Sequence, residues 1–376
     1  MLSLNEITQQ TPQLVALLRE LVEIESPSSE KAAVDGMSRA VAGHLERLGA
    51  RVERLPQAQA GDLVIGRFHP DDPRPGILII GHMDTVHPLG TLARMPCEAR
   101  DGRLHGPGTL DMKAGIAIAL FTAGLLQQHG LSTSLPLTML FTSDEETGSL
   151  VSRPVIERLA RQAALVLCME PGMPGGGLKT WRKGVGEFLV TAYGRAAHAG
   201  SDHAQGRNAI EELAHQVIAI QRLTDYSRGT TLNAGVVKGG TASNVVPEQA
   251  SLEVDLRVMD PAEVGRITQA LQGLQPALEG TRLEVQGSLN RPPMPRDERM
   301  IAAFEKARAI AAGIGIELSE GGTGGGSDAN FVAPLGVAVL DGLSGWGDGM
   351  HSEREYVQID SLGQRAALLA ALLTRW

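Results

Sequence analysis

The sequence from residue 75 to residue 84 reads PGILIIGHMD. Its apolar run, residues 77–80, is bounded by Pro-Gly on one side and by Gly on the other, which are typical strand boundaries. Because the run does not alternate with polar residues, it predicts a strand that is buried on both faces of a sheet. His82 and Asp84 follow where this strand ends, and ligands of open α/β sheets bind at such ends.

Apolar runs and helical patterns alternate on both sides of this strand. The first helix shows leucines at the spacing of one helical face, with Thr11 expected as its N-cap. This alternation predicts an α/β domain whose central sheet is mainly parallel and flanked by helices. The expected elements are helices at 11–24, 30–48 and 113–128 and strands at 137–142 and 164–169.

The pattern changes near residue 181, and the α/β character returns after residue 292. The segment between them has the order β-α-β-β-α-β, which is typical of a small, ferredoxin-like α+β domain with one open sheet face. We therefore expect an inserted domain at 183–291 between two parts of a larger domain, 1–182 and 292–376. The expected elements are strands at 185–193, 232–237, 251–258, 281–287 and 337–340 and helices at 208–223, 261–278, 299–312 and 361–374.

Composition restricts the class of protein further. The chain has 376 residues and a formal net charge of −9, which suits two domains and argues against a nucleic-acid partner. Its two cysteines, Cys97 and Cys168, form no C-x-x-C pair, so no disulfide framework or cysteine zinc site is expected. We see no signal-peptide pattern and no apolar run near the roughly 18 residues that a membrane span needs. The expectation is a cytoplasmic protein without a membrane partner.

Histidines and acidic residues recur where the predicted strands end. Each has an ordinary explanation when taken alone, because Asp111 could cap the following helix and residues 144–146 could form a solvated turn. Together they form a set that suits Zn²⁺, with Mn²⁺ or Co²⁺ as substitutes. The set is large enough for two ions about 3.5–4 Å apart that share a bridging carboxylate. Its candidate ligands are His82, Asp111, Glu146, Glu170 and His351.

The chain contains the motifs GHMDTV (81–86), GPGTLDMKAG (106–115), TSDEETGS (142–149), MEPG (169–172), RKGVGEF (182–188), GRAAHAG (194–200), SNVVPE (243–248), TGGGSDANF (323–331) and GMHSEREYV (349–357). In these motifs it resembles the M20 family of metallopeptidases, and most closely its glutamate carboxypeptidase branch, the carboxypeptidase G type. The resemblance covers nearly the whole chain and departs from the family pattern at no metal position.

The resemblance implies a zinc-exopeptidase-like catalytic domain, an inserted dimerisation or lid domain, and two Zn²⁺ ions per chain. One ion would be bound by His82 and Glu170 and the other by Glu146 and His351, with Asp111 as the bridge. It also implies a cis peptide bond after Asp111. Two further roles follow from the resemblance: Asp84 would orient His82, and Glu145 would be the general base.

Substrate recognition calls for groups that bind a free carboxylate. Arginine does so with a bidentate fork, so Arg257 and Arg291 are candidates, although each could equally be a surface salt bridge. The glycine-rich loop at 321–327 offers main-chain N–H groups for an anion, in particular those of Gly325, Gly326 and Ser327. The resemblance implies that Asn244 and Arg257 reach the site from the small domain.

His198, at the end of the small domain's first strand, is an imidazole donor suited to a developing oxyanion. The resemblance implies that two chains pair through their small domains and that His198 of one completes the site of the other. A histidine that merely caps the strand end is the structural alternative.

These observations favour hydrolysis of an amide bond next to a free carboxylate in a peptide or N-acyl amino acid. The alternatives are an aminoacylase or deacylase of the same family and, less favoured, a dipeptidase. A non-catalytic binding protein would lack a ligand or Glu145, and neither is missing. A dehydrogenase is excluded because no G-x-G-x-x-G follows the first strand.

Overall fold

The computed structural model describes residues 3–376, which form two compact units. The larger unit comprises the chain up to Trp181, Arg296–Gly322 and Ser327–Trp376, and the smaller unit comprises Arg182–Pro295 and Thr323–Gly326. The smaller unit thus extends beyond the expected 183–291. The cause is main-chain pairing: Arg182 and Met294 exchange two hydrogen bonds, and the Thr323 carbonyl accepts one from the Lys183 N–H.

The larger unit contains a central sheet whose middle strands are parallel. Its order is β1-β2-β6-β3-β7-β14-β8-β13. The parallel neighbours are β6, β3, β7 and β14, whereas β1 and β2 pair antiparallel at one edge and β14 pairs antiparallel with β8. The expected mainly parallel sheet is therefore confirmed, with antiparallel edges that are not among the predicted elements. The strands are β1 (Arg51–Leu55), β2 (Leu63–Phe68), β3 (Gly76–His82), β6 (Leu137–Thr142), β7 (Ala163–Cys168), β8 (Leu178–Arg182), β13 (Glu320–Thr323) and β14 (Val339–Asp341).

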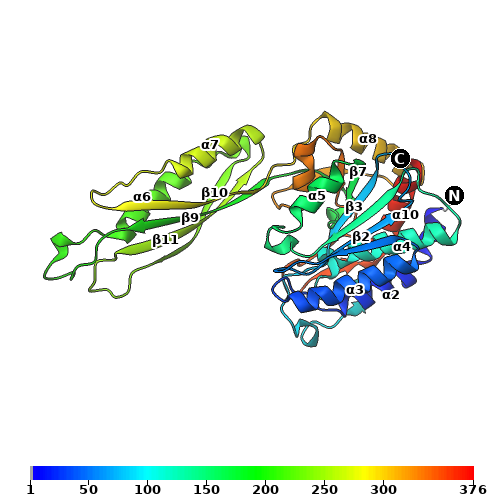
Figure 1. The fold of residues 1–376 in the computed structure, drawn as a ribbon, viewed down its shortest axis with the longest axis horizontal. Helices are drawn as coiled ribbons and strands as arrows, with labels where there is room; N and C mark the ends of the chain where they lie inside the picture. Colours follow the sequence, from blue (N-terminus) through cyan, green and yellow to red (C-terminus); the bar gives the residue numbers. More distant parts are fainter. Residues whose placement is uncertain (1–2) are drawn as a thin grey trace. The chain divides into compact units, whose positions relative to one another are not determined.

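This sheet is buried on both faces, as the apolar run of β3 predicts. Ile77 and Ile79 belong to a core shared with several helices, while Leu78 and Ile80, which point to the opposite face, are also buried. Figure 1 shows helices along both sides of the sheet. The helices are α1 (Leu4–Thr8), α2 (Thr11–Val22), α3 (Lys31–Arg47), α4 (Ala114–Gln128), α5 (Arg153–Ala160), α8 (Glu298–Ala312), α9 (Ala329–Val332) and α10 (Ile359–Arg375).

Two expectations about helices in the larger unit need correction. Thr11 is not an N-cap: Gln10 holds that position without a side-chain bond, and the Thr11 hydroxyl donates to the Thr8 carbonyl at 2.7 Å. The segment Thr109–Gln128 is also long and apolar enough to span a membrane, against the expectation that no run is. However, 83% of its most apolar window is buried inside the protein, and α4 packs against α2 and α10. It is therefore a core helix of the larger unit.

The smaller unit has the expected β-α-β-β-α-β order. Its strands pair antiparallel in the order β10-β11-β9-β12. One face packs against the two helices through buried residues such as Val190, Leu252 and Ile267, while Glu187 and Leu189 on the other face are exposed. The elements are β9 (Gly184–Tyr193), α6 (Ala209–Gln221), β10 (Thr231–Gly239), β11 (Gln249–Val258), α7 (Pro261–Gln272) and β12 (Arg282–Arg291).

Helix α7 ends at Gln272, earlier than the expected residue 278. The chain after it is held in a non-helical path by the buried carboxylate of Glu212, which accepts hydrogen bonds from the N–H groups of Ala277 and Leu278. A tertiary contact therefore overrides the local helical pattern.

Candidate metal centre

Three adjacent parallel strands bring predicted site residues to one edge of the larger sheet. His82 ends β3, Glu145 and Glu146 follow β6, and Glu170 follows β7. Because β6, β3 and β7 run parallel in neighbouring positions, their carboxyl ends meet. Residues far apart in the sequence thus reach the same place through the sheet alone.

A second, small sheet brings in the other two candidate ligands. Its order is β15-β16-β5-β4, formed by Gly347–Asp348, Tyr356–Gln358, Arg103–His105 and Glu98–Arg100. The segment 106–113, which carries Asp111, begins directly after β5, and the loop that carries His351 lies between β15 and β16. Because β5 and β16 pair with His105 opposite Tyr356, the two segments lie side by side.

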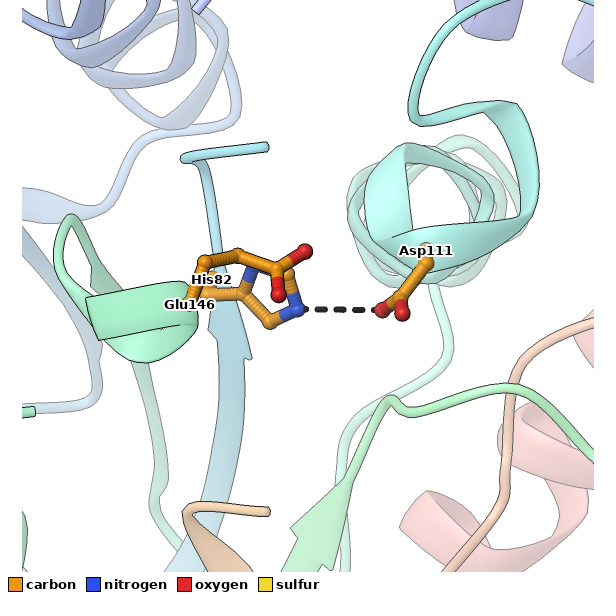
Figure 2. Close-up of side chains that lie close together, drawn as sticks. All are labelled: His82, Asp111 and Glu146. Atoms are coloured by element: carbon orange, nitrogen blue, oxygen red, sulfur yellow. Dashed lines mark hydrogen bonds and ion pairs between the residues drawn. The ribbon is translucent and has the colours of Figure 1, made fainter. Parts of the chain in front are cut away.

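The side chains of the five candidate ligands lie together, with Asp111 between the two histidines. Its Oδ1 lies 3.2 Å from Nε2 of His82, and its Oδ2 lies 3.4 Å from Nε2 of His351. Glu146 Oε2 is 3.3 Å from the same His351 nitrogen, and Glu170 Oε1 is 3.6 Å from His82 Nε2. Figure 2 shows His82 and Glu146 facing Asp111, and ligand atoms of these three residues lie within 4.8 Å of one another. The Asp111–Met112 peptide bond is cis, as the resemblance implies.

Hydrogen bonds and charge interactions between the imidazoles and the carboxylates shift the pKa values within the cluster. Burial raises the pKa of the Asp111 carboxyl, but hydrogen bonds from His351 and His82 outweigh burial and bring that pKa well below its ordinary value. Hydrogen bonds to Asp111 and Glu146 raise the pKa of His351 to about 10. Burial raises the pKa of Glu146. A divalent cation would take the place of these protons, because metal ligands bind in their deprotonated forms.

One atom of the cluster fits a metal ligand particularly well. Glu146 Oε1 is buried and has no hydrogen-bond partner within the described residues 3–376. Such an atom is costly unless something compensates it, and a cation does so. The donor set, two imidazoles with carboxylates, is also one that suits zinc. The residues present therefore fit a metal centre.

Asp84 is fully buried beside the cluster and supports it from two directions. His82 Nδ1 lies 2.9 Å from the Asp84 carbonyl and 3.5 Å from its Oδ1, which leaves Nε2 facing Asp111. The Asp84 carboxylate also accepts hydrogen bonds from the N–H groups of Glu145 and Glu146, each at 3.2 Å, and from Ser28 Oγ at 2.7 Å. Glu145 itself is half-buried.

The structure adds Glu355 and His87 to the site, two residues that the sequence reasoning does not single out. His87 is buried, and its Nε2 lies 2.7 Å from Glu355 Oε2. The only sequence signal was the place of Glu355 within the GMHSEREYV motif, four residues after His351.

His198 and Asn244 lie close together in the smaller unit. The Asn244 carbonyl accepts from the Ala199 N–H at 2.9 Å, and His198 pairs with Val245 in an isolated bridge. His198 Nδ1 accepts from the N–H groups of Gly200 and Ser201, each at 3.1 Å. A neutral His198 ring therefore carries its proton on Nε2, on an exposed side chain. His198 has a capping contact and an available donor at the same time.

The two candidate arginines differ in environment. Arg257 is bound by Asp255, at 2.9 Å through Nε and 2.8 Å through Nη2, and its Nη1 donates to the Gly324 carbonyl at 3.3 Å. Arg291 is buried, and its Cδ lies so close to Gly326 that a side chain there would collide with it. Both arginines thus lie against the glycine-rich loop.

That loop uses part of its hydrogen-bonding capacity within the chain. Gly325 N–H donates to Thr323 Oγ1 at 3.2 Å, and the N–H of the buried Ser327 donates to Asn330 Oδ1 at 2.8 Å. In this structure these two N–H groups thus have acceptors within the chain. The carbonyls of Gly325 and Gly326 accept from Arg182. The side chains of Thr323, Asn330 and Arg182 therefore hold the loop in place, and no local sequence pattern predicts these contacts.

Imidazoles and carboxylates at the carboxyl ends of a parallel sheet, with a further glutamate beside them, are an arrangement typical of metal-dependent hydrolases. Comparison with known proteins gives the family: the model of peptidase family M20/M25/M40 matches residues 78–375, and this chain belongs to that family, whose members are metal-dependent. The protein is thus a hydrolase of the metallopeptidase type.

Individual relatives place the chain near the carboxypeptidase G branch. It is 31% identical to carboxypeptidase G2 of Pseudomonas sp. (strain RS-16), over 97% of this chain and 90% of the relative. It is 29% identical to succinyl-diaminopimelate desuccinylase of Rhodospirillum centenum, over 97% of both chains. The fold resembles a dinuclear metal-binding M20 peptidase from Bacillus subtilis, with a TM-score of 0.69 and 17% identity over 96% of this chain and 97% of that chain.

Proposed function

We propose that this protein is a zinc-dependent exopeptidase that hydrolyses the amide bond next to a free carboxylate and releases an amino acid, of which glutamate is the first candidate. The convergence of the five candidate ligands, Asp111 among them, carries the proposal of hydrolysis. The choice of a glutamate-type carboxypeptidase is supported by the full-length likeness to carboxypeptidase G2.

The distances within the cluster support two zinc sites. His82 and Glu170 would hold one ion, Glu146 and His351 the other, and the two oxygens of Asp111 face one imidazole each. The likeness to a dinuclear peptidase supports the same count. When bound, two zinc ions supply Lewis acidity toward a carbonyl and lower the pKa of water. Co²⁺ or Mn²⁺ would suit the same ligands.

The protein's own groups account for proton transfer. Glu145 is adjacent in sequence to the ligand Glu146, and the five candidate ligands suffice for the metal site without it. Its half-buried carboxylate can accept a proton from the attacking water and deliver it to the leaving amine. Asp84 accepts a hydrogen bond from the N–H of Glu145 and also contacts the ring of His82. The same residue therefore positions both the base and this ligand.

Arg257 is our candidate for binding the substrate carboxylate. Its guanidinium lies on β11, is about one-third exposed, and is already oriented by Asp255. A guanidinium can share its remaining N–H donors with a second carboxylate. Arg291 is buried and is the weaker candidate for direct contact.

We infer in addition that two chains pair through their smaller units. Strand β10 is an edge strand whose Val236 and Val237 are exposed, and such an edge can pair with another chain. Helix α6 packs beside it and exposes Ile210 and Ile218 on its outer face. The partner subunit would then receive the exposed Nε2 donor of His198 at its own site.

A second candidate function is hydrolysis of N-acyl amino acids, as in an aminoacylase. The likeness to a desuccinylase over 97% of the chain favours it. The deciding experiment is to assay the zinc-loaded protein against matched panels of N-acyl-glutamates, peptides ending in glutamate, and N-acyl derivatives of other amino acids. Preferred release of glutamate from several donors supports the carboxypeptidase. A strong preference for one acyl group whatever the amino acid supports the deacylase. No release from any donor contradicts both.

A further inference from the structure

The Glu355 side chain is fully buried, and four donors surround its carboxylate. Its Oε1 accepts from the main-chain N–H groups of Leu110, at 2.8 Å, and Asp111, at 2.9 Å. Its Oε2 accepts from the Gly108 N–H at 3.1 Å and lies 2.7 Å from Nε2 of His87. A carboxylate has about four acceptor sites on its two oxygens, so these donors use its capacity fully.

These contacts join three segments that each carry a candidate metal ligand. His87 lies five residues after His82, Asp111 is bonded through its own N–H, and Glu355 lies four residues after His351. Glu355 is bonded to the main-chain N–H of Asp111, so its influence on this ligand passes through the main chain. A single buried carboxylate therefore sets the spacing of three ligand-bearing segments.

The 108–111 turn depends on this carboxylate for its own shape. Gly108 has a φ of +69°, and a side chain at that position would meet the Thr85 methyl group, so the turn passes close to the His82 segment. Three of its N–H groups converge on Glu355, an arrangement that stabilises an anion in a concave main-chain turn. Without that anion, the three N–H groups, two of them buried, would lose their acceptor.

We propose that Glu355 is a positioning residue of the metal centre, held by His87, which brings the bridging Asp111 into register with His82 and His351. This role for Glu355 rests on the zinc site that is proposed above. Groups behind metal ligands commonly change metal affinity by ~10–100-fold when they are mutated.

Glu355→Gln is the direct test because it keeps the shape of the side chain. The amide nitrogen of glutamine replaces one carboxylate oxygen. It cannot accept hydrogen bonds from the N–H groups that surround this position. We expect zinc affinity, measured on the full-length protein by competition with a chelator, to fall ~10–100-fold.

The chain offers a matched control in Glu212. This carboxylate is also fully buried and accepts from two main-chain N–H groups, Ala277 and Leu278, and from the side chains of Gln216 and Thr281. It lies in the smaller unit, away in sequence from every candidate ligand. Glu212→Gln should lower the melting temperature as Glu355→Gln does but leave zinc affinity per folded chain unchanged.

His87 provides a second test that does not require the Glu355 variant to fold. His87→Leu removes the donor, whereas the amide of His87→Gln can still donate to Glu355 from a similar reach. We expect zinc affinity to fall about fivefold or more in the leucine variant and to be largely retained in the glutamine variant.

The outcomes separate this proposal from the proposed function. If the unaltered protein binds no zinc, the proposed function fails. If the unaltered protein binds zinc, and Glu355→Gln and His87→Leu bind it equally well, Glu355 is only structural and the proposal is overturned. If Glu355→Gln does not fold, the His87 pair decides, and equal affinity in the two His87 variants overturns the proposal.

Discussion

The carboxylate of Asp84 accepts a hydrogen bond from the main-chain N–H of Glu145 at 3.2 Å. Asp84 also lies behind the ring of His82. The group that orients a candidate metal ligand thus also anchors the candidate general base. Because both functions share one buried carboxylate, the base and the metal cluster are held as one rigid assembly.

Replacing Glu145 by glutamine should abolish turnover without releasing metal. The change removes the base and keeps the shape, and a general base commonly contributes ~10²–10⁴-fold to the rate. The check is kcat together with metal content on the same preparation. Glu146→Gln is the comparison, since it should lose metal. A Glu145→Gln protein with near-normal kcat, or one that has lost its metal, contradicts the assignment.

Removal of metal should abolish activity, and zinc should restore it at two ions per chain. Because His351 must lose its proton to bind metal, and its pKa is about 10 beside Asp111 and Glu146, protons compete with zinc. Zinc affinity should therefore rise between about pH 6 and about pH 8. Chelator competition at several pH values measures this. Full activity with at most one ion per chain, or affinity independent of pH, speaks against it.

Arg257→Ala should raise KM for substrates with a free α-carboxylate and lower the preference for them over the matching amides. The reason is the loss of a bidentate donor for the carboxylate. Arg282→Ala, an exposed arginine on β12, serves as the control. Equal losses on acid and amide substrates would show that Arg257 acts through its contacts with Asp255 and Gly324 alone.

Lys113 should make stability depend on pH. It is fully buried, its Nζ donates to the Ile24 carbonyl at 2.7 Å, and burial lowers its pKa from 10.5 to about 7. Between these two values the unfolded chain binds a proton that the folded chain lacks, so stability rises with pH across that window. Below it the penalty is constant.

Lys113→Met removes this dependence and loses the bond to Ile24 at every pH. Relative to the variant, the unaltered protein should therefore gain up to about 3 kcal/mol between about pH 7 and about pH 9.5. Denaturant unfolding at constant zinc concentration measures the difference. Lys306→Met, an exposed lysine on α8, is the control. Parallel pH profiles for the unaltered and Lys113→Met proteins would refute the prediction.

Mixing two inactive variants should restore activity if His198 acts across a dimer. In a mixed dimer of His198→Ala and Glu145→Gln chains, one site carries both defects and the other carries neither. Losing one oxyanion donor typically costs roughly 10²–10³ in kcat, so the regained activity is measurable. The assay needs conditions under which exchange of subunits is demonstrated. A mixture that stays inactive despite exchange, or a fully active monomer, rules out the shared site.

Local sequence patterns were sufficient to predict the strands after which most of the candidate ligands lie. The apolar runs of β3, β6 and β7 need no partner to be recognised, because burial on both faces demands continuous apolar residues. Their polar successors, His82, Glu146 and Glu170, could then be placed at one edge, since parallel strands end together.

The tertiary structure alone decided how Asp111, His351 and Glu355 meet. Nothing local indicates that β5 pairs with β16, or that His87 contacts Glu355 across 268 residues of sequence. Likewise, the N–H of Ser327 looks available in the sequence, yet Asn330 takes it in the folded chain. Hydrophobic periodicity is a property of a few consecutive residues, whereas the partners of buried polar groups depend on which distant segments the packed core brings beside them.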